Sequence, residues 1–380
     1  MKKLVLLFLA SILLTGCNNK NSGKELTFWT LQMGDFEPYI NKIISQYEQN
    51  NPQIKIKWVD VPFSEGEKRT LAAVMTDNPP DLINLNPDFS AMLAQKGTLW
   101  EIDKSNLTNF HPEIVEALEY QRKTYSIPWY ATSAITIYNK DLFQKTGLLR
   151  LPKTYQELAD ISKVIKEKTG TYSYLPPITE NDTTVKILNK YGISDEKDYE
   201  SENAKKVYDM FRTLYKNHLI PPETIMVTHR EALEQYMAGK LVFYQGGANF
   251  LNMVKENAPR VYAQTDVCEQ IKGPIGQNDF SVMNFVIPLK ARHKKEALDF
   301  CLFLTNAENQ LELAKMTNII STNTEVLNNN FYNNYSTLEA KARSISAKQL
   351  NKITPQVKQK SNQKEINTRL NLYVQKYLTE

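Results

Sequence analysis

The residues best placed to do chemistry are polar side chains that directly follow short strand patterns. Asn86 and Asp88 follow one such pattern, and Thr30 and Gln32 follow another. A fixed carboxylate or amide at the end of a strand can hydrogen-bond the hydroxyl groups of a small polar ligand. These four residues are therefore candidate ligand contacts. For Asp88 an alternative stays open, which is that its carboxylate only caps the helix that follows.

The elements that position these residues alternate between strand and helix. Strand patterns cover 25–30, 52–61 and 79–85, and amphipathic helix patterns at 36–49 and 65–75 separate them. Strands joined through helices pair in parallel, and ligands of such sheets bind beyond the carboxyl ends of the strands. The order predicts an α/β sheet with Thr30, Gln32, Asn86 and Asp88 along one edge.

A second group of candidates lies at the entrance of another predicted strand, directly after Pro128. Pro128 fits the entrance of a strand, because its ring fixes φ and removes a ladder donor. Trp129 and Tyr130 follow it, and the alternating run 132–137 then predicts a strand. A large aromatic side chain such as Trp129 at this junction could stack on a ligand or pack a hinge.

Serine acyl-transfer chemistry has only weak support in the sequence. Lys145-Thr-Gly147 and Lys168-Thr-Gly170 match a motif of penicillin-recognising serine enzymes, and Ser194 and Ser361 each precede a lysine by three residues. Both serines follow the Lys-Thr-Gly elements, whereas those enzymes place the nucleophile first. We therefore predict no catalytic residues of this type.

Metal and nucleotide chemistry lack their usual spacings. The four histidines form no His-x-x-x-His pattern, and there is no Cys-x-x-Cys pair. The sequence also lacks a Gly-x-x-x-x-Gly-Lys-Ser/Thr loop. We expect neither a metal nor a cofactor. A glycosidase that uses two carboxylates stays an open alternative, because such pairs meet only in the folded chain.

The N-terminal segment predicts export and lipidation. Lys2 and Lys3 precede an apolar run at 4–14, which is shorter than the roughly 20 residues that a transmembrane helix needs. Leu14-Thr-Gly-Cys17 resembles a bacterial lipobox, so residues 1–16 are expected to be a signal peptide and Cys17 the lipidated residue. Residues 17–24 then form a lipidated tether at the cell membrane, on its periplasmic or extracellular face.

Composition bounds the rest of the chain. About 360 residues follow the leader. A single hydrophobic core rarely extends over so many residues, so two lobes are favoured. The net charge of +4 falls to +2 without Lys2 and Lys3, so neither nucleic acid nor an acidic surface is expected as a partner. Whether Cys268 and Cys301 form a disulfide cannot be read from their spacing.

Ordered motifs along most of the chain resemble one family. The matching pieces include Asn51-Pro-Gln-Ile-Lys-Ile56, Pro80-Asp-Leu-Ile83, Gly97-Thr-Leu-Trp-Glu-Ile-Asp103, Tyr125-Ser-Ile-Pro-Trp-Tyr130, Ile137-Tyr-Asn-Lys-Asp-Leu-Phe143 and Pro152-Lys-Thr-Tyr-Gln-Glu-Leu158. They resemble the carbohydrate-binding solute receptors of ABC importers, the maltose-binding-protein-like group. The resemblance implies a two-lobed periplasmic-binding-protein fold, α/β, in which each lobe is a mainly parallel sheet flanked by helices and three crossings form the hinge.

The same resemblance implies lobe limits and further ligand contacts. It places residues 25–128 and 283–321 in an N-terminal lobe, and residues 129–282 and 322–380 in a C-terminal lobe. It adds Tyr174, Gly247, Asn249 and Phe250 to Trp129 and Tyr130 as contacts near the hinge or in the second lobe. Family members often have a tryptophan shortly after the glycine that matches Gly247, and this chain lacks it. At the returning crossing, where family members commonly carry glycines, this chain has Met283-Asn284.

The function implied by the family is capture of a sugar, without catalysis, by a monomer that docks on a membrane permease pair driven by a separate ATPase. Three alternatives stay open. The ligand could be glycerol phosphate, another anion or a polyol, and an anion would require Arg or Lys in the cleft. The protein could be a sensory or adhesive lipoprotein on the same fold. It could also be a hydrolase of the cell envelope.

Overall fold

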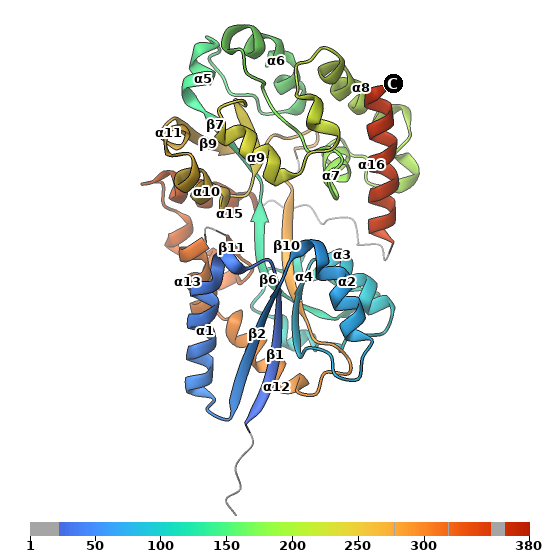
Figure 1. The fold of residues 1–380 in the computed structure, drawn as a ribbon, viewed down its shortest axis with the longest axis vertical. Helices are drawn as coiled ribbons and strands as arrows, with labels where there is room; N and C mark the ends of the chain where they lie inside the picture. The colour runs from blue at the N-terminus through green and yellow to red at the C-terminus, as the bar shows by residue number, and fades with distance from the viewer. Residues whose placement is uncertain (1–22, 277, 318, 351–361) are drawn as a thin grey trace, which may run out of the picture.

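Two sheets with separate sets of helices form the two lobes of the protein (Figure 1). The structure is a computed structural model, and it describes residues 23–276, 278–317, 319–350 and 362–380. The predicted signal peptide, Cys17 and most of the tether lie outside the described residues. Within the described part of the chain, no helix combines the length and apolarity that crossing a bilayer would require.

The first lobe is built on a six-stranded sheet with the order β11-β6-β10-β3-β1-β2. β1 pairs in parallel with β2 and β3, whereas the pairs made by β10 and β11 are antiparallel. The strands are β1 (Lys24–Leu31), β2 (Ile54–Val61), β3 (Leu82–Leu85), β6 (Ser126–Ser133), β10 (Phe280–Val286) and β11 (Ile320–Ser321).

Helices cover both faces of this sheet. One core is built around Phe28, which meets Phe300 edge-on with ring centroids 5.4 Å apart, and the opposite face packs Leu31 and Leu85 beneath other helices. The helices of this lobe are α1 (Glu37–Asn50), α2 (Phe63–Val74), α3 (Pro87–Gln95), α4 (Pro112–Ala117), α12 (Lys294–Leu304) and α13 (Ala307–Thr317). The small hairpin β4 (Glu119–Tyr120) and β5 (Lys123–Thr124) joins α4 to β6.

The second lobe has a three-stranded antiparallel sheet with the order β8-β7-β9. Its strands are β7 (Ile135–Asn139), β8 (Phe243–Gly246) and β9 (Thr265–Glu269). Its helices are α5 (Lys140–Lys145), α6 (Tyr155–Thr169), α7 (Thr183–Lys190), α8 (Glu202–Lys216), α9 (His229–Met237), α10 (Phe250–Asn257), α11 (Pro259–Ala263) and α16 (Gln363–Thr379). In Figure 1, α7 and α16 lie on the side of this lobe that faces α2 and α3.

Three stretches of chain connect the lobes. The first is Ala134 alone, between β6 and β7, and the second is 270–279, between β9 and β10. The third follows β11 through α14 (Thr324–Leu327) and α15 (Leu338–Leu350). α15 bridges the lobes, because Ala342 belongs to a core of the second lobe and Leu350 to a core of the first. The remaining short 3-10 turns are η1 (Gly34–Phe36), η2 (Lys104–Leu107), η3 (Glu196–Asp198), η4 (Pro222–Ile225) and η5 (Asn330–Tyr332).

The two-lobed α/β architecture agrees with the sequence-based prediction, but the strand directions do not. Each lobe was expected to hold a mainly parallel sheet, whereas the first sheet is mixed and the second is antiparallel. The reason is that β6, β7, β9 and β10 are crossing strands, which run between the lobes without a helix that would return them in parallel. Because β6 and β10 pair from Phe280↔Ser133 to Val286↔Ser126, the first lobe's sheet also runs past the limits expected at residues 128 and 283.

Candidate functional site

The carboxyl end of β1 supports a tight turn rather than exposing all of its polar groups. Thr30 is fully buried, and its hydroxyl donates to Asp60 Oδ1 at 2.7 Å while it accepts from Trp58 Nε1 at 2.8 Å. Gln32 follows in the left-handed region, with φ of 52°, and its side chain is exposed. Asp60 also accepts from the backbone N–H of Met33 at 2.9 Å. Thr30 is therefore a residue that shapes the turn, and Gln32 is the one that stays available.

The carboxyl end of β3 has a clear division of roles between two polar side chains. Asn86 is the N-cap of α3, and its Oδ1 accepts from the backbone N–H of Phe89 at 2.8 Å. Asp88 lies in the first turn of the same helix and does not cap it. The alternative in which Asp88 serves as the helix cap is therefore wrong, because Asn86 already fills that role.

Asp88 faces charged groups that come from the second lobe. Burial, the largest cause, and the neighbouring Asp182 and Glu67 together raise the pKa of its carboxyl to about 7, although Lys186 opposes them. Asp182 and Lys186 belong to the α7 region, and their carboxylate and ammonium groups lie 3.0 Å apart. Glu67 comes from α2 of the first lobe. We call Glu67, Asp88, Asp182 and Lys186 the interlobe cluster.

Direct contacts between the lobes accompany this cluster. Lys186 Nζ donates to the hydroxyl of Ser281, on β10 of the first lobe, at 2.9 Å. Burial alone would lower the pKa of Lys186, but the surrounding carboxylates of Asp182, Asp279 and Asp88 raise it above its usual value. Lys364 of α16 forms an ion pair with Glu67. Lysines of the second lobe therefore meet acidic and hydroxyl groups of the first.

His229 and Glu180 lie next to the interlobe cluster in the second lobe. The backbone N–H of His229 donates to Glu180 Oε2 at 2.5 Å, and Thr183 Oγ1 lies 3.2 Å from the imidazole Nε2. Burial and the nearby Lys186 ammonium lower the pKa of His229 to about 4, although Asp182 opposes them. The imidazole is thus neutral above about pH 5 and offers one donor and one acceptor.

Trp129 occupies a different place from the one expected for a ligand contact. Its side chain is 0% exposed, and its indole stacks on Phe285 with ring centroids 4.5 Å apart. The ladder between β6 and β10 is irregular here, because Met283 pairs with Tyr130 and Asn284 with Pro128. This β-bulge turns the indole into the core of the first lobe. Two roles were considered for Trp129, stacking on a ligand and packing a hinge, and the structure supports packing.

The bulge at Trp129 is stabilised by the third crossing. The carbonyl oxygen of Trp129 accepts from Gln310 Nε2 at 2.6 Å and from Thr322 Oγ1 at 3.1 Å. Tyr130, next in the chain, is half-buried, and its hydroxyl lies 3.7 Å from Met33 Sδ beside the turn after β1. Tyr130 therefore stays among the candidates that border the turn with Gln32.

The candidates in the second lobe also include both buried packing residues and residues that stay partly accessible. Tyr174 is buried in the core of the second lobe, so its ring has no free face for a ligand. Gly247 is half-buried, and a Cβ atom there would lie 2.4 Å from Asn249 Oδ1 and 3.8 Å from the Thr132 side chain. Asn249 and Phe250 are half-buried at the start of α10. Gly247 thus approaches the first crossing, whereas Tyr174 is a packing residue.

The interlobe cluster contains residues that the sequence-based candidates missed. Asp182 and Lys186 are spaced i, i+4 around the start of a helix, which is a signal for a charge pair on one helical face. Ser281 and His229 offered no pattern that would separate them from other polar residues. Cys268 and Cys301 do not form a disulfide. Cys301 is a buried thiol in the first lobe, and Cys268 is a free thiol on β9 of the second.

Comparison with known proteins gives a consistent result. The sequence profile of bacterial extracellular solute-binding proteins matches residues 42–340. A binding protein of Brucella abortus (strain 2308) is 23% identical over 321 residues, which covers 80% of this chain and 77% of that protein. The multiple sugar-binding protein of Streptococcus mutans serotype c is 28% identical over 172 residues, or 43% of this chain and 40% of that one.

Solved structures show the same fold. A candidate oligosaccharide periplasmic-binding protein of Synechococcus sp. MITs9220 has a TM-score of 0.84 and 27% sequence identity, and covers 93% of both chains. The maltose-bound MalE3 protein of T. maritima has a TM-score of 0.75 and 20% identity, and covers 93% of this chain and 94% of that one. At that identity the second likeness concerns the fold alone.

Proposed function

The chain belongs to the family of bacterial extracellular solute-binding proteins, and on that premise we propose that it captures a sugar between its two lobes and delivers it to the permease of an ABC importer. The observation that carries this proposal is the interlobe cluster, in which Asp182 and Lys186 of the second lobe lie close enough to Asp88 of the first for their charges to shift its pKa. A ligand that contacts both sides favours the closed arrangement by its differential contact with that state.

The chemistry of the cluster favours a neutral, hydroxyl-rich ligand. The three carboxylates of Glu67, Asp88 and Asp182 outnumber the two ammonium groups beside them, those of Lys186 and of Lys364, which pairs with Glu67. This excess of negative charge disfavours an anion such as glycerol phosphate, because a second negative charge would have to be buried beside them. Sugars and polyols instead donate hydroxyl hydrogen bonds to carboxylates. The name of the Streptococcus mutans relative, a multiple sugar-binding protein, supports the same class.

The finer parts of the proposal concern anchoring and site residues. We place Gln32, Asp88, Asn249 and Lys186 against the ligand, with Tyr130, Gly247 and Phe250 at the border of the site. Cys17 would carry the lipid that holds the protein at the membrane, and the receptor would act as a monomer without turnover of its ligand. A sensory lipoprotein on this fold would share the ligand site but lack the permease partner.

A ligand screen tests the proposal directly. The chain from Gly23 to Glu380, which contains every described residue, is heated with monosaccharides, oligosaccharides, polyols and glycerol phosphate in turn. A ligand of the native state stabilises it by RT ln(1 + [L]/Kd), about 2.7 kcal/mol at a hundredfold excess over Kd. We expect a raised unfolding midpoint with one sugar or polyol and with no product formed. No response to any of them, or release of a cleaved product, would contradict the proposal.

The affinity for the ligand is expected to depend on pH through Asp88. Its carboxyl, with a pKa of about 7, is largely protonated at pH 6 and ionised at pH 8. Only the ionised form accepts a hydroxyl hydrogen bond at both oxygens, so binding should release a proton and tighten by about tenfold from pH 6 to pH 8. Isothermal titration calorimetry in two buffers of different ionisation enthalpy measures both effects.

The control for this pH dependence is Asp88→Asn. Its affinity should be weaker and nearly flat over the same pH range, because His229 with a pKa of about 4 does not titrate there. Without ligand the sign is opposite for folding: the raised pKa of Asp88 adds stability below about pH 4 that is lost as pH rises through 7. An affinity that falls from pH 6 to pH 8 would contradict a hydroxyl donor at Asp88.

A further inference from the structure

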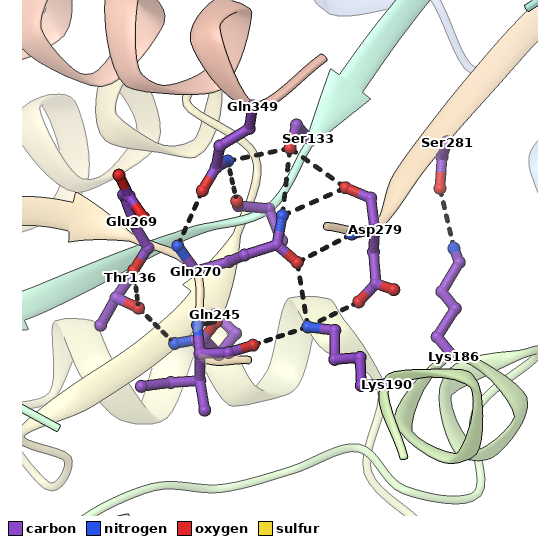
Figure 2. Close-up of polar contacts among 12 residues, drawn as sticks. Ser133, Thr136, Lys186, Lys190, Gln245, Glu269, Gln270, Asp279, Ser281 and Gln349 are labelled. Atoms are coloured by element: carbon purple, nitrogen blue, oxygen red, sulfur yellow. Dashed lines mark hydrogen bonds and ion pairs between the residues drawn. The ribbon is translucent and has the colours of Figure 1, made fainter. Parts of the chain in front are cut away.

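A buried ion pair lies where the chain passes between the lobes (Figure 2). Lys190, the last residue of α7, is 2% exposed, and its Nζ lies 2.8 Å from Asp279 Oδ2. The same ammonium donates to Gln270 Oε1 at 2.9 Å and to the backbone carbonyl of Ile271 at 2.7 Å. Gln270 and Asp279 are the two ends of the second crossing. The C-terminal residue of α7, a helix of the second lobe, therefore contacts both ends of that crossing.

The first and third crossings join the same set of contacts. Ser133, at the end of β6, donates to the backbone carbonyl of Asp279 at 3.0 Å and accepts from Gln270 Nε2 at 3.2 Å. Gln349 of α15 donates to Ser133 Oγ at 2.9 Å and accepts from the backbone N–H of Gln270 at 2.9 Å. We call Ser133, Lys190, Gln270, Asp279 and Gln349 the hinge clasp.

The hinge clasp leaves little freedom to its members. Gln270 uses both ends of its amide, because its Oε1 also accepts from the backbone N–H of Asp279 at 2.9 Å. The loop between them is packed on the helix end: a Cβ atom at Gly273 would lie 2.2 Å from the carbonyl oxygen of Lys190. A buried polar network with its partners in place is rigid and specifies one arrangement.

The clasp is connected to the interlobe cluster through α7. Lys186 lies one helical turn before Lys190, so the two side chains leave the same face of the helix. Figure 2 shows both reaching from α7 toward the start of β10, Lys190 to Asp279 and Lys186 to Ser281. Any rotation of α7 about its end would move Lys186, and with it Asp182, relative to Asp88.

We propose that the hinge clasp sets the angle between the lobes in the ligand-free protein, and that Lys190 is a positioning residue that holds Asp182 and Lys186 against the first lobe. The consequence for ligand affinity rests on the proposed function, whereas the consequence for the lobe angle does not. The Asp279 carboxylate also acts on the Lys186 ammonium through its charge, so the change that isolates the orientation of α7 is one that removes a clasp hydrogen bond and no charge.

The experiment measures the distance between the lobes without a ligand. Spin labels are attached at Gln49→Cys on α1 and Lys163→Cys on α6, both exposed, in a Cys268→Ser background of the chain from Gly23. Electron double resonance then gives the distance distribution between the lobes. We expect Asp279→Asn to broaden the distribution and to shift its maximum, because it removes the charge that holds Lys190.

A second variant and a control keep the result interpretable. Ser133→Ala removes one hydroxyl of the clasp and no charge, and should broaden the distribution in the same way. Lys205→Met removes a lysine from an exposed pair whose atoms are also 2.8 Å apart, and should leave it unchanged. If Asp279→Asn and Ser133→Ala both fold and both keep the parent's distance distribution, the proposal that the hinge clasp sets the angle between the lobes is overturned.

Ligand affinity provides the second readout. If the binding-competent orientation falls to a tenth of the population, the apparent Kd rises about tenfold. We expect a loss of this order in Asp279→Asn and Ser133→Ala for the sugar or polyol found in the screen, and none in Lys205→Met. A changed distance distribution with unchanged affinity would overturn the role of Lys190 in positioning the cluster. Should no sugar or polyol bind the parent, the proposed function fails while the distance measurement still decides the clasp.

Discussion

Trp129→Ala is expected to lower the free energy of unfolding by about 4 kcal/mol, the typical cost of removing a large buried aromatic side chain. Trp129 is fully buried, stacks on Phe285 and meets Tyr130 edge-on with ring centroids 5.0 Å apart. The neighbours cannot collapse into the space, because the bulge that carries Trp129 is held by Gln310 and Thr322. Urea unfolding of the parent and the variant, followed by circular dichroism, measures the difference.

Trp129→Phe separates packing from ligand binding. Phenylalanine keeps a ring against Phe285 and removes the indole N–H, which has no hydrogen-bond partner among the described residues. The cost should therefore stay below about 2 kcal/mol, and the folded variant should bind ligand as the parent does. A tenfold weaker affinity in folded Trp129→Phe would contradict this, since it would mean that the indole leaves the core to meet the ligand.

Helices with complete local signals were predictable from the sequence nearly to the residue. In α6, Thr154 and Glu157 form a capping box and Gly170 ends the helix with φ of 71°. In α16, Ile366, Leu370 and Val374 follow one another at intervals of four residues and are buried on one face. Caps and one apolar face are properties of neighbouring residues, so a short window of sequence contains them.

The crossings were harder, because alternation alone does not say which sheet a strand joins. The run 132–137 reads as one strand, yet the structure divides it at Ala134 between β6 of the first sheet and β7 of the second. Both halves are extended, so the period of two continues through the break. The bulge at Trp129 has the same origin: it depends on the register with β10, which lies far away in sequence.

The candidate site was predicted best where a strand end fixes the position. Asp88 follows β3 and does face the second lobe, but its partners Asp182 and Lys186 belong to a helix that the sequence reading did not single out. Thr30 and Tyr174 were plausible by type, but the fold buries both, Thr30 in the hydrogen bonds of a turn and Tyr174 in the core of the second lobe. Which of two polar or aromatic side chains stays free is decided by contacts between distant segments, and no local pattern encodes these.

Asp279→Asn is the second change with a large expected effect, about 3 kcal/mol of unfolding free energy. It leaves the Lys190 ammonium buried with two neutral acceptors, Gln270 Oε1 and the Ile271 carbonyl. Burial already lowers the pKa of Lys190, and Asp279 offsets part of that effect. Without Asp279 the pKa falls further, so the loss of stability should be greatest near neutral pH and should shrink as pH rises and Lys190 loses its proton. Urea unfolding at pH 7 and pH 9.5 measures both features.

The double variant Lys190→Met with Asp279→Asn identifies the source of this loss. A buried pair can be replaced by uncharged groups at little cost, whereas removal of one partner leaves an uncompensated charge. The double variant should therefore recover most of the stability that Asp279→Asn loses. Lys205→Met, which breaks an exposed pair, should leave the free energy of unfolding nearly unchanged. If the double variant is instead as unstable as the sum of its two changes, the loss arises from packing at the hinge, and the charge of Lys190 is not what the clasp depends on.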